Sequence, residues 1–345
     1  MSQLASVAVL DRLARTSTAR GAPALGERLV ALDRWVREDL NTFETELAAV
    51  PRGARVVHAA AHHLLDLRGK CLRPMCVALA SRFGEGFTPQ ARSLAVAVEL
   101  VHSATLLHDD VVDVAERRRG QPTASTVYGN AASIFAGDWL LVAALRRIVA
   151  SGVDGVLDRM LAVIDEMIVA ESVQLERRGK LAGAREDYFA IVEGKTAALF
   201  RWAMIAGARA AGLSAAHETA LERFGLHLGV AFQAVDDELD FADTTGKDPL
   251  ADLREGKLTF PLVVALEREP TLRGRIEELL ADDIPKRPEL LAIGAAVKAT
   301  GALAATRALA EDHVQRALAI LDELPAGPAR EALVTVALAS LERQS

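Results

Sequence analysis

Two clusters of aspartates lie at the ends of long, mostly apolar segments, residues 96–113 and 228–240, and the first segment contains no helix breaker. Side chains three, four and seven residues apart share one face of an α-helix. Each segment therefore predicts a helix whose carboxylates point in nearly the same direction, with His102 on the face of the first cluster and Gln233 on that of the second. The clustered carboxylates are Asp109, Asp110 and Asp113 in the first segment and Asp236, Asp237 and Asp240 in the second.

Carboxylates held this close together repel one another. Two of them about 6 Å apart repel by roughly 3 kcal/mol at an effective dielectric constant near 20. A hard divalent cation relieves this repulsion, and Mg²⁺ binds such carboxylates together with water and substrate phosphate. We therefore predict that both faces bind Mg²⁺. The alternative is that each cluster is a solvated helix end whose charges pair with nearby arginines, such as those in residues 117–119.

Basic residues next to glycines could bind a phosphorylated ligand. A lysine that follows a glycine is a candidate ligand at three of the five places where this pair of residues occurs, because the backbone can approach an anion closely there. None of these places is a GxxxxGK[ST] loop, and no GxGxxG is present, so the sequence does not favour a nucleotide enzyme. The lysines are Lys70, Lys195 and Lys257, and arginines near the same motifs are Arg73, Arg118 and Arg119.

The elements that position these residues are expected to be helices. Of the 345 residues only 4% are aromatic, and Ala, Leu, Arg and Glu dominate, which favours helices over sheets. Short stretches rich in Gly, Pro and Asp separate the helical segments, and no linker or change of composition divides them. We expect an all-α fold with a single catalytic domain over residues 26–345, preceded by a mobile leader over residues 1–25.

Charge, cysteine content and hydropathy narrow the class of protein further. Forty basic and 47 acidic side chains give a net charge of −7, which argues against nucleic acid as a partner. Cys71 and Cys76 fit neither a CxxC motif nor a zinc site, and they predict reduced thiols in a cytoplasmic protein. No run approaches ~18 consecutive apolar residues, so no transmembrane segment is expected.

In their order along the chain, these motifs resemble those of the trans-isoprenyl (polyprenyl) diphosphate synthases, and in particular the long-chain, octaprenyl-like branch. The resemblance implies about a dozen mostly antiparallel helices around a central cavity, and a homodimer. It also implies Mg²⁺, with three ions per active site when substrate is bound. The motifs that carry it are Leu107–Asp113, Arg118–Gly120, Gly194–Thr196, Phe232–Asp240 and Asp252–Lys257.

The resemblance implies two substrates, isopentenyl diphosphate and an allylic diphosphate, and a role for each matching residue. The six clustered aspartates would hold Mg²⁺ and, with Lys195, are the predicted catalytic residues. The residues that would contact the allylic diphosphate are Arg118, Lys195, Thr196, Gln233, Lys247 and Lys257. Those that would contact isopentenyl diphosphate are Lys70, Arg73, His102 and Arg119.

Some positions depart from the family pattern. Cys71 replaces an arginine of the usual Gly-Gly-Lys-Arg-x-Arg-Pro motif, and this change is expected to weaken the binding of isopentenyl diphosphate. The segment between Asp240 and Lys247 is shorter than usual, and Glu116 stands where aspartate is common.

The implied reaction requires no protein nucleophile. Metal ions and basic groups stabilise the departing diphosphate, the allylic C–O bond ionises, the isopentenyl double bond attacks the cation, and a proton is lost. Neither GxSxG nor HExxH occurs in the chain, and His108 is expected to be a packed or capping residue rather than a base. Two alternatives stay open: a class I terpene cyclase, which normally lacks a second DDxxD motif, and a non-catalytic subunit of a heteromeric synthase.

Product length is predicted from side chains that precede the first aspartate cluster. Each helical residue advances about 1.5 Å, so these side chains would meet successive parts of the growing tail. In the family a bulky aromatic residue four or five positions before the first aspartate gives short products, whereas this chain has Ala104 and Thr105 there. The resemblance therefore implies a product of about C30 to C50, unless Phe135 or Trp139 closes the tunnel further down. Peripheral contact with a membrane during product release is compatible with such a product.

Overall fold

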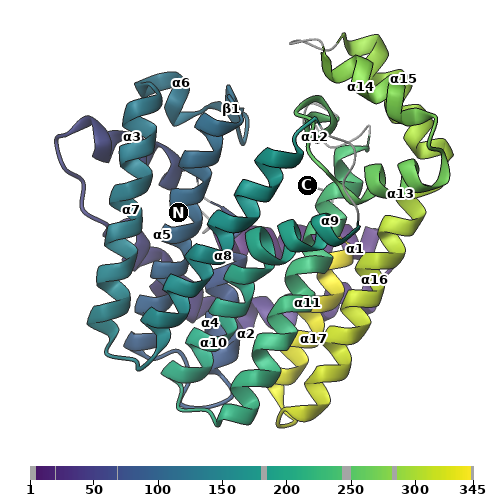
Figure 1. The fold of residues 1–345 in the computed structure, drawn as a ribbon. Helices are drawn as coiled ribbons and strands as arrows, with labels where there is room; N and C mark the ends of the chain where they lie inside the picture. The colour runs from purple at the N-terminus through teal and green to yellow at the C-terminus, as the bar shows by residue number, and fades with distance from the viewer. Residues whose placement is uncertain are drawn as a thin grey trace. The chain divides into compact units, whose positions relative to one another are not determined.

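Helices make up nearly all of the regular structure (Figure 1). The computed structural model describes residues 5–19, 21–67, 69–179, 185–242, 250–281 and 286–342. Strands β1 (Arg117–Arg118) and β2 (Gln121–Pro122) form a two-residue antiparallel pair. The predicted all-α fold is confirmed.

The first half of the chain contains helices α1 (Ala5–Ala19), α2 (Pro23–Ala48), α3 (Val56–Leu65), α4 (Leu72–Ser81), α5 (Pro89–Val112), α6 (Ala124–Tyr128), α7 (Asn130–Ser151) and α8 (Val156–Arg177). The second half contains α9 (Arg185–Ile191), the π-helix η1 (Val192–Ala197), α10 (Ala198–Ala210), α11 (Ala215–Asp240), α12 (Ala251–Arg254), α13 (Phe260–Arg268), α14 (Leu272–Ala281), α15 (Arg287–Ala299), α16 (Ala302–Ile320), the 3-10 helix η2 (Leu321–Glu323) and α17 (Pro328–Leu341).

The chain divides into two compact units, which are described separately. The boundaries between the units fall within helices α8, α10, α11, η2 and α17. The single catalytic domain over residues 26–345 stays a prediction. Unit 1 comprises Met1–Met160, Trp202–Glu222 and Asp322–Thr335, and unit 2 comprises Leu161–Arg201, Arg223–Leu321 and Val336–Ser345.

Helix α5 lies at the centre of unit 1 and is buried over most of its length. It begins where the Thr88 hydroxyl accepts a hydrogen bond from the Ala91 N–H, at 3.2 Å. Helix α7 packs alongside α5, and the Ser133 hydroxyl of α7 donates to the Leu107 carbonyl at 2.9 Å. His108 Nε2 lies 3.2 Å from the Ile134 carbonyl of α7. His108 thus contacts α7, and its expected role as a packed or capping residue rather than a base stays a prediction.

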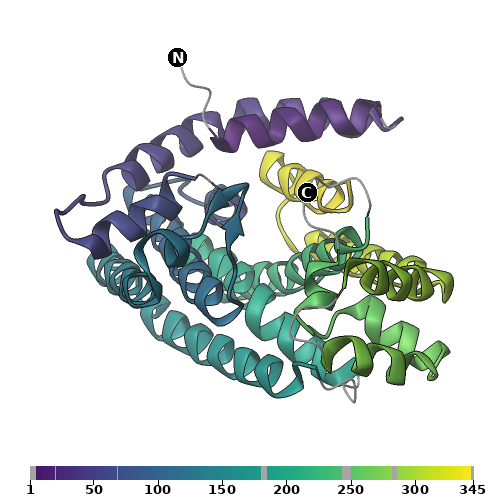
Figure 2. The same ribbon diagram turned by 90° about the horizontal axis from the view of Figure 1, so that it is seen from above.

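Helices α1 and α2 pack side by side at the start of unit 1 (Figure 2). A Cβ atom at Gly26 of α2 would lie 2.2 Å from Thr18 Oγ1 of α1, so the close approach requires glycine. Leu10 and Ala14 of α1 are buried. Residues 5–19 of the predicted leader therefore form a helix whose apolar side chains pack within this unit.

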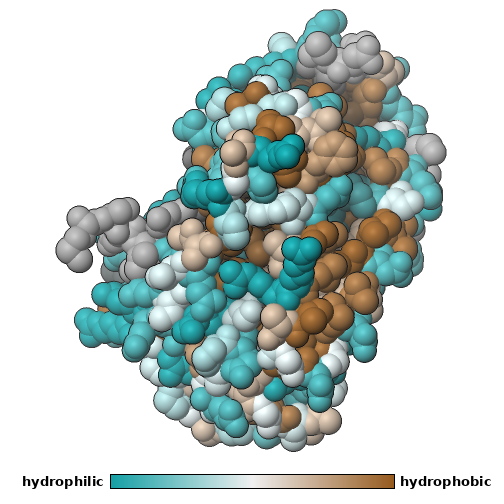
Figure 3. All heavy atoms as spheres, turned by 90° about the vertical axis from the view of Figure 1, so that its left-hand side faces the viewer, coloured by the Kyte–Doolittle hydropathy of each residue, from teal (hydrophilic) through white to brown (hydrophobic). Residues whose placement is uncertain are grey.

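The outer face of α7 is apolar. Figure 3 views the side on which α7 lies and shows hydrophobic side chains gathered in a patch there. Phe135, Val142 and Val149, at intervals of seven residues, are 59%, 46% and 62% exposed. Trp139 instead packs edge-on against His58 of α3, with ring centroids 4.9 Å apart. Neither Phe135 nor Trp139 lies on the buried stripe of α7 that faces α5.

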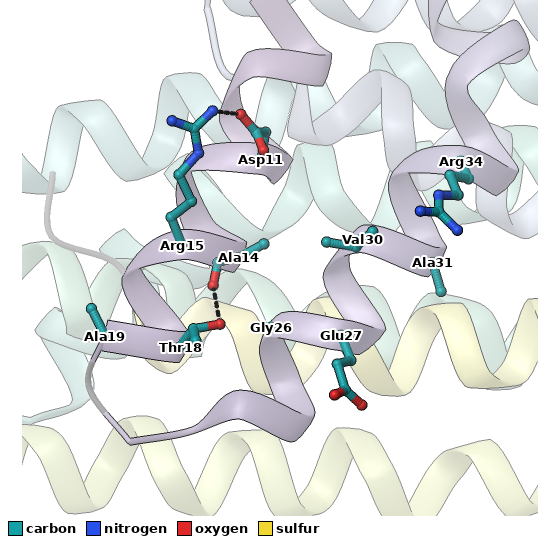
Figure 4. A pocket seen from close by; sticks show the side chains of 10 residues that line it. All are labelled: Asp11, Ala14, Arg15, Thr18, Ala19, Gly26, Glu27, Val30, Ala31 and Arg34. Carbon is teal, nitrogen blue, oxygen red and sulfur yellow. Dashed lines mark hydrogen bonds and ion pairs between the residues drawn. The ribbon is translucent and has the colours of Figure 1, made fainter.

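A groove of about 670 Å³ runs along α1 and α2 (Figure 4). Its walls carry small and charged side chains, among them Ala14, Arg15 and Arg34. Arg15 forms an ion pair with Asp11 one turn earlier in α1. The groove therefore has no concentration of charge of one sign.

The core of unit 2 joins α9, α13, α15 and α16 through buried side chains that include Tyr188, Phe260, Ile293 and Val297. In the described part of the chain, no single helix is long and apolar enough to cross a membrane. The pair α15 and α16, bent by 62°, meets that test by length and composition.

Candidate active site

The first aspartate cluster lies at the C-terminal end of α5. Asp110 is only 1% exposed, and its Oδ1 accepts a hydrogen bond from Arg118 Nε at 2.7 Å. Asp109 and Asp113, four residues apart, are half-buried on a common face of α5. The alternative of pairing with an arginine therefore describes Asp110. The prediction that Asp109 and Asp113 bind a metal stays a prediction.

The β1–β2 hairpin places two predicted diphosphate ligands next to this helix end. Arg119 and Gly120 form its two-residue turn with φ values of 51° and 79°, as a type I′ turn requires. His63 Nε2 of α3 lies 2.8 Å from the Pro122 carbonyl and anchors the second strand. Arg118 is thus held by Asp110, and Arg119 lies at the tip of an anchored hairpin.

Three of the residues predicted to bind isopentenyl diphosphate are close enough to influence one another. Burial lowers the pKa of His102 well below its usual value, and the charges of Arg73 and Arg119 lower it further. His102 is therefore neutral at pH 7. Lys70 and Cys71 directly precede α4, which carries Arg73, and Cys71 has a left-handed backbone with φ of 50°. Unit 1 thus brings the predicted cations to one place.

Glu99 of α5 belongs to the same cluster and was missed in the sequence. It is 6% exposed, and burial raises its pKa while Arg73 and Arg119 lower it. A cavity of about 320 Å³ is lined by Glu99 together with Gly69, Cys71 and Arg119. The signal that could have revealed Glu99 is an acidic residue inside an apolar helical segment, three positions before His102.

In unit 2 a chain of hydrogen bonds links three predicted residues. The Thr196 hydroxyl donates to Gln233 Oε1 at 2.8 Å, and Gln233 Nε2 donates to Asp237 Oδ1 at 2.8 Å. The backbone N–H of Phe260 donates to Asp237 Oδ2 at 3.1 Å. Asp237 is 2% exposed. This aspartate therefore orients Gln233, and through it Thr196.

The pKa of Asp237 rises to about 7, mainly because the carboxyl is buried and also because of the charge of Asp252. The hydrogen bonds from Gln233 and Phe260 oppose this rise. Tyr188 of α9 also lies against the carboxyl, and the pKa of its phenol is raised, first by its own burial and then by Asp237. Both oxygens of Asp237 are therefore occupied by groups of the protein.

Asp240, the last aspartate of the second cluster, caps α12. Its Oδ1 and Oδ2 accept hydrogen bonds from the backbone N–H groups of Ala251 at 3.0 Å and Asp252 at 3.3 Å. Burial and the nearby Asp252 raise the pKa of Asp240 to about 7. Lys257 Nζ lies 2.7 Å from Glu255 and 3.9 Å from Asp252. Asp252, which was not predicted as a site residue, therefore connects Asp240 with Lys257.

Lys195 and Thr196 lie in the π-helix η1, which the sequence does not predict. Lys195 forms an ion pair with Glu171 of α8. A Cβ atom at Gly194 would lie 2.9 Å from the Glu166 carbonyl oxygen of α8, so only glycine allows this approach. Single π-helical turns inside α-helices are frequent at functional sites. Here the turn sets Lys195 against α8 and Thr196 against α11.

The predicted residues thus form two sets, one in each unit. Lys247 lies outside the described residues. Among the residues that are described, no three Asp, Glu, His or Cys side chains converge closely enough to hold a metal by themselves. The donor set still fits Mg²⁺, because this ion is usually bound by one or two carboxylates, with water and substrate phosphate completing its shell.

Comparison with known proteins agrees with this arrangement. Residues 54–294 match the family described as polyprenyl synthetase. Octaprenyl diphosphate synthase of Escherichia coli (strain K12) is 33% identical over 293 residues, which cover 84% of this chain and 90% of the relative. Heptaprenyl diphosphate synthase component 2 of Geobacillus stearothermophilus is 34% identical over 317 residues, covering 90% of this chain and 98% of the relative.

A solved structure is also similar. It is a polyprenyl synthase from Caulobacter crescentus complexed with calcium and isoprenyl diphosphate, with a TM-score of 0.85 and 35% identity. The match covers 92% of this chain and 98% of that one.

Proposed function

Because the chain belongs to the polyprenyl synthetase family and is thus a trans-prenyltransferase, we propose that it condenses isopentenyl diphosphate with an allylic diphosphate, head to tail, to give a long-chain polyprenyl diphosphate. The observation that carries this proposal is the gathering of Arg73, His102 and Arg119 in unit 1. The cations Arg73 and Arg119 are additional to Lys195 and Lys257, which accompany the second aspartate cluster. Two cationic sets suit two diphosphates, whereas a terpene cyclase needs only one.

We propose that the six aspartates divide the work between metal and protein. Asp109, Asp113 and Asp236 are each half-buried and would hold the Mg²⁺ ions directly, three ions per active site with substrate bound. Bound Mg²⁺ neutralises the departing diphosphate. The remaining aspartates would act through the groups they bind, which are Arg118 for Asp110, Gln233 for Asp237, and the start of α12 for Asp240.

The remaining residues position the substrates. Neutral His102 can donate a hydrogen bond to a phosphate without adding charge, while Arg73 and Arg119 supply the positive charge. Thr196, held by Gln233, would present its hydroxyl to the allylic diphosphate together with Lys195. The released diphosphate would accept the proton, so no side chain is required as a base.

The test is a direct assay with Mg²⁺, labelled isopentenyl diphosphate, and allylic primers of increasing length. We expect labelled linear products longer than C20, resolved by chromatography. A cyclic hydrocarbon formed from the primer alone would favour the cyclase instead. Activity only after addition of a second chain would favour the heteromeric alternative, for which the Geobacillus relative, named as component 2, is a precedent in name.

We further propose that the enzyme is a homodimer. Seven-residue intervals also separate Leu161, Ile168 and Leu175 of α8, which are 48%, 63% and 47% exposed. Unit 1 presents the corresponding stripe on α7, and stripes of this length are unusual on a monomer. In a two-fold pair each copy offers the same surface to the other, so a second copy would cover both stripes.

The dimer can be tested by sedimentation. Phe135→Asp and Ile168→Asp are each expected to shift the protein from a dimer to a monomer of 36.8 kDa, because a charge would be buried in the contact. Val56→Asp, an equally exposed site outside both stripes, is the control and should leave the dimer intact. A wild-type monomer at micromolar concentration would contradict this part of the proposal.

We also propose a cytoplasmic location, with peripheral membrane contact when the product is released.

A further inference from the structure

We propose that Glu99 is a positioning residue, whose carboxylate holds the guanidinium groups of Arg73 and Arg119 in the orientation that receives the diphosphate of isopentenyl diphosphate. The inference rests on the proposed function and adds to it a residue that does not itself contact the substrate. No role follows for Glu99 from the aspartate motifs or from the basic motifs.

The placement of Glu99 is the first observation. Its side chain is 6% exposed, on the part of α5 that precedes His102. A buried carboxylate is expensive unless cations compensate for the lost water. The cations that lower the pKa of Glu99 are Arg73 first and Arg119 second. Burial raises the pKa of Glu99, and the positive charges of Arg73 and Arg119 act on the same carboxyl in the opposite direction.

The second observation is that the two arginines belong to different structural elements. Arg73 belongs to the first turn of α4, whereas Arg119 lies at the tip of the β1–β2 hairpin. Burial lowers the pKa of Arg119, and Glu99 is the largest of the influences that raise it again. Two cations from separate elements repel each other unless an anion lies between them. Glu99 supplies that anion from a third element, the rigid helix α5.

Gly69 provides an independent observation. A Cβ atom there would lie 3.0 Å from Arg119 Nη2 and 3.1 Å from Glu99 Oε1. The backbone of Gly69 has no positive φ, so glycine is not needed for the conformation. A side chain at this position would press on both Glu99 and Arg119, which would each have to shift by a few tenths of an ångström. The same glycine belongs to the lysine motif that carries Lys70.

The arrangement makes opposite predictions for two roles of the carboxylate. If Glu99 only added negative charge, its removal would strengthen the binding of an anionic substrate. If it positions the arginines, its removal weakens binding, because the donors no longer converge on one phosphate. The position of Glu99 between two cations from different elements favours the second outcome.

The experiment measures KM for isopentenyl diphosphate and for the allylic diphosphate, together with kcat, in the full-length enzyme with Mg²⁺. In Glu99→Gln we expect KM for isopentenyl diphosphate to rise about 10-fold or more, the range for loss of a charge-assisted hydrogen bond. KM for the allylic substrate should stay within about twofold, since its predicted ligands do not include Arg73 or Arg119. Glu99→Asp should recover part of the loss.

Two further variants complete the test. Gly69→Ala should give the same selective rise, because it displaces Glu99 and Arg119 while keeping both charges. Glu44→Gln removes a carboxylate from the wall of the same cavity and is the matched control, with no selective change expected. Circular dichroism checks that each variant is folded, and if Glu99→Gln is not, Glu99→Asp and Gly69→Ala decide.

Calorimetry of isopentenyl diphosphate binding distinguishes a failure of the proposed function from a failure of the proposed role of Glu99. If the wild type neither binds nor consumes it, the proposed function fails and the inference fails with it. If the wild type binds it and Glu99→Gln binds it equally or more tightly, only the inference is overturned. An equal rise of both KM values would likewise overturn it, since that result would mean a general loss of structure.

Discussion

Replacing Gly194 by alanine probes how closely the π-helix η1 must approach α8. The added Cβ would lie 2.7 Å from the Cβ of Ala170 and 2.9 Å from the Glu166 carbonyl oxygen, against an ordinary contact of at least 3.4 Å. Neither neighbour is the end of a flexible side chain. The π-helix must therefore move away from α8 by at least 0.5 to 0.7 Å, the difference between these distances.

This displacement affects catalysis more than stability. Crowding of a packed interface costs about 1–3 kcal/mol, and alanine regains up to about 1 kcal/mol of helix propensity over glycine. The free energy of unfolding should therefore fall by no more than about 2 kcal/mol. Lys195 and Thr196 move with the π-helix, and misplacing such groups by 1 Å can reduce the rate about 100-fold. We expect kcat to fall about 10-fold or more.

The assay is kcat at saturating substrates, paired with urea unfolding. The control is Gly274→Ala in α14, where an added Cβ meets no atom within 4 Å. That variant should gain about 0.5–1 kcal/mol of stability and keep its kcat. If Gly194→Ala retains more than half of the wild-type kcat, the close approach of η1 to α8 is not what positions Lys195, and the reasoning is refuted.

Three further predictions concern the metal site, product length and pH. Asp236→Ala should reduce turnover below one tenth with unchanged circular dichroism, because loss of a metal ligand relieves repulsion without opening a cavity; higher turnover would contradict its role. Thr105→Phe should shorten the products, which product chromatography would detect. Ala104→Phe should chiefly destabilise α5 and lower the melting temperature, because Ala104 lies on the buried stripe that faces α7. Burial lowers the pKa of His313 to about 4, so folding favours its neutral form. The stability from this residue should be complete above pH 6.5 and decline as the pH falls towards 4, and His313→Gln should flatten that part of the urea-unfolding profile.

The helices and shared faces of the site could be predicted from the sequence. Residues 96–113 contain no helix breaker and residues 228–240 contain only Gly229, and spacings of three, four and seven place their carboxylates together. Burial could not be predicted, because it depends on neighbours far away in the chain. The spacing makes Asp109 and Asp110 look alike, and it does not reveal that Arg118 of the hairpin donates a hydrogen bond to Asp110. Similarly, the N–H of Phe260 occupies Asp237, 23 residues earlier.

Product length illustrates a different limit. The positions four and five residues before Asp109 are equally close in sequence, and both carry small side chains. The structure separates them, because Ser133 of α7 bonds to the Leu107 carbonyl and His108 bonds to Ile134. Ala104 lies three and four residues before these contacts and so faces α7, while Thr105 lies one turn before Asp109. The helical period alone predicts that Ala104 and Thr105 lie on different faces of α5. Only the position of α7 shows which of these faces is already packed against another helix.

The parts of the site that escaped sequence reasoning share a physical feature. Among the described residues, the non-glycine positions with positive φ are Cys71, Val114, Arg119 and Leu250. They lie beside Lys70, after Asp113, at the hairpin tip, and before α12, which Asp240 caps. Left-handed backbone is disfavoured for each of these residue types, so local propensity predicts it at none of them. Such strain persists only where surrounding contacts impose it. Its concentration at the loops around the acidic and basic motifs therefore indicates that these loops are held for binding, at some expense of local stability.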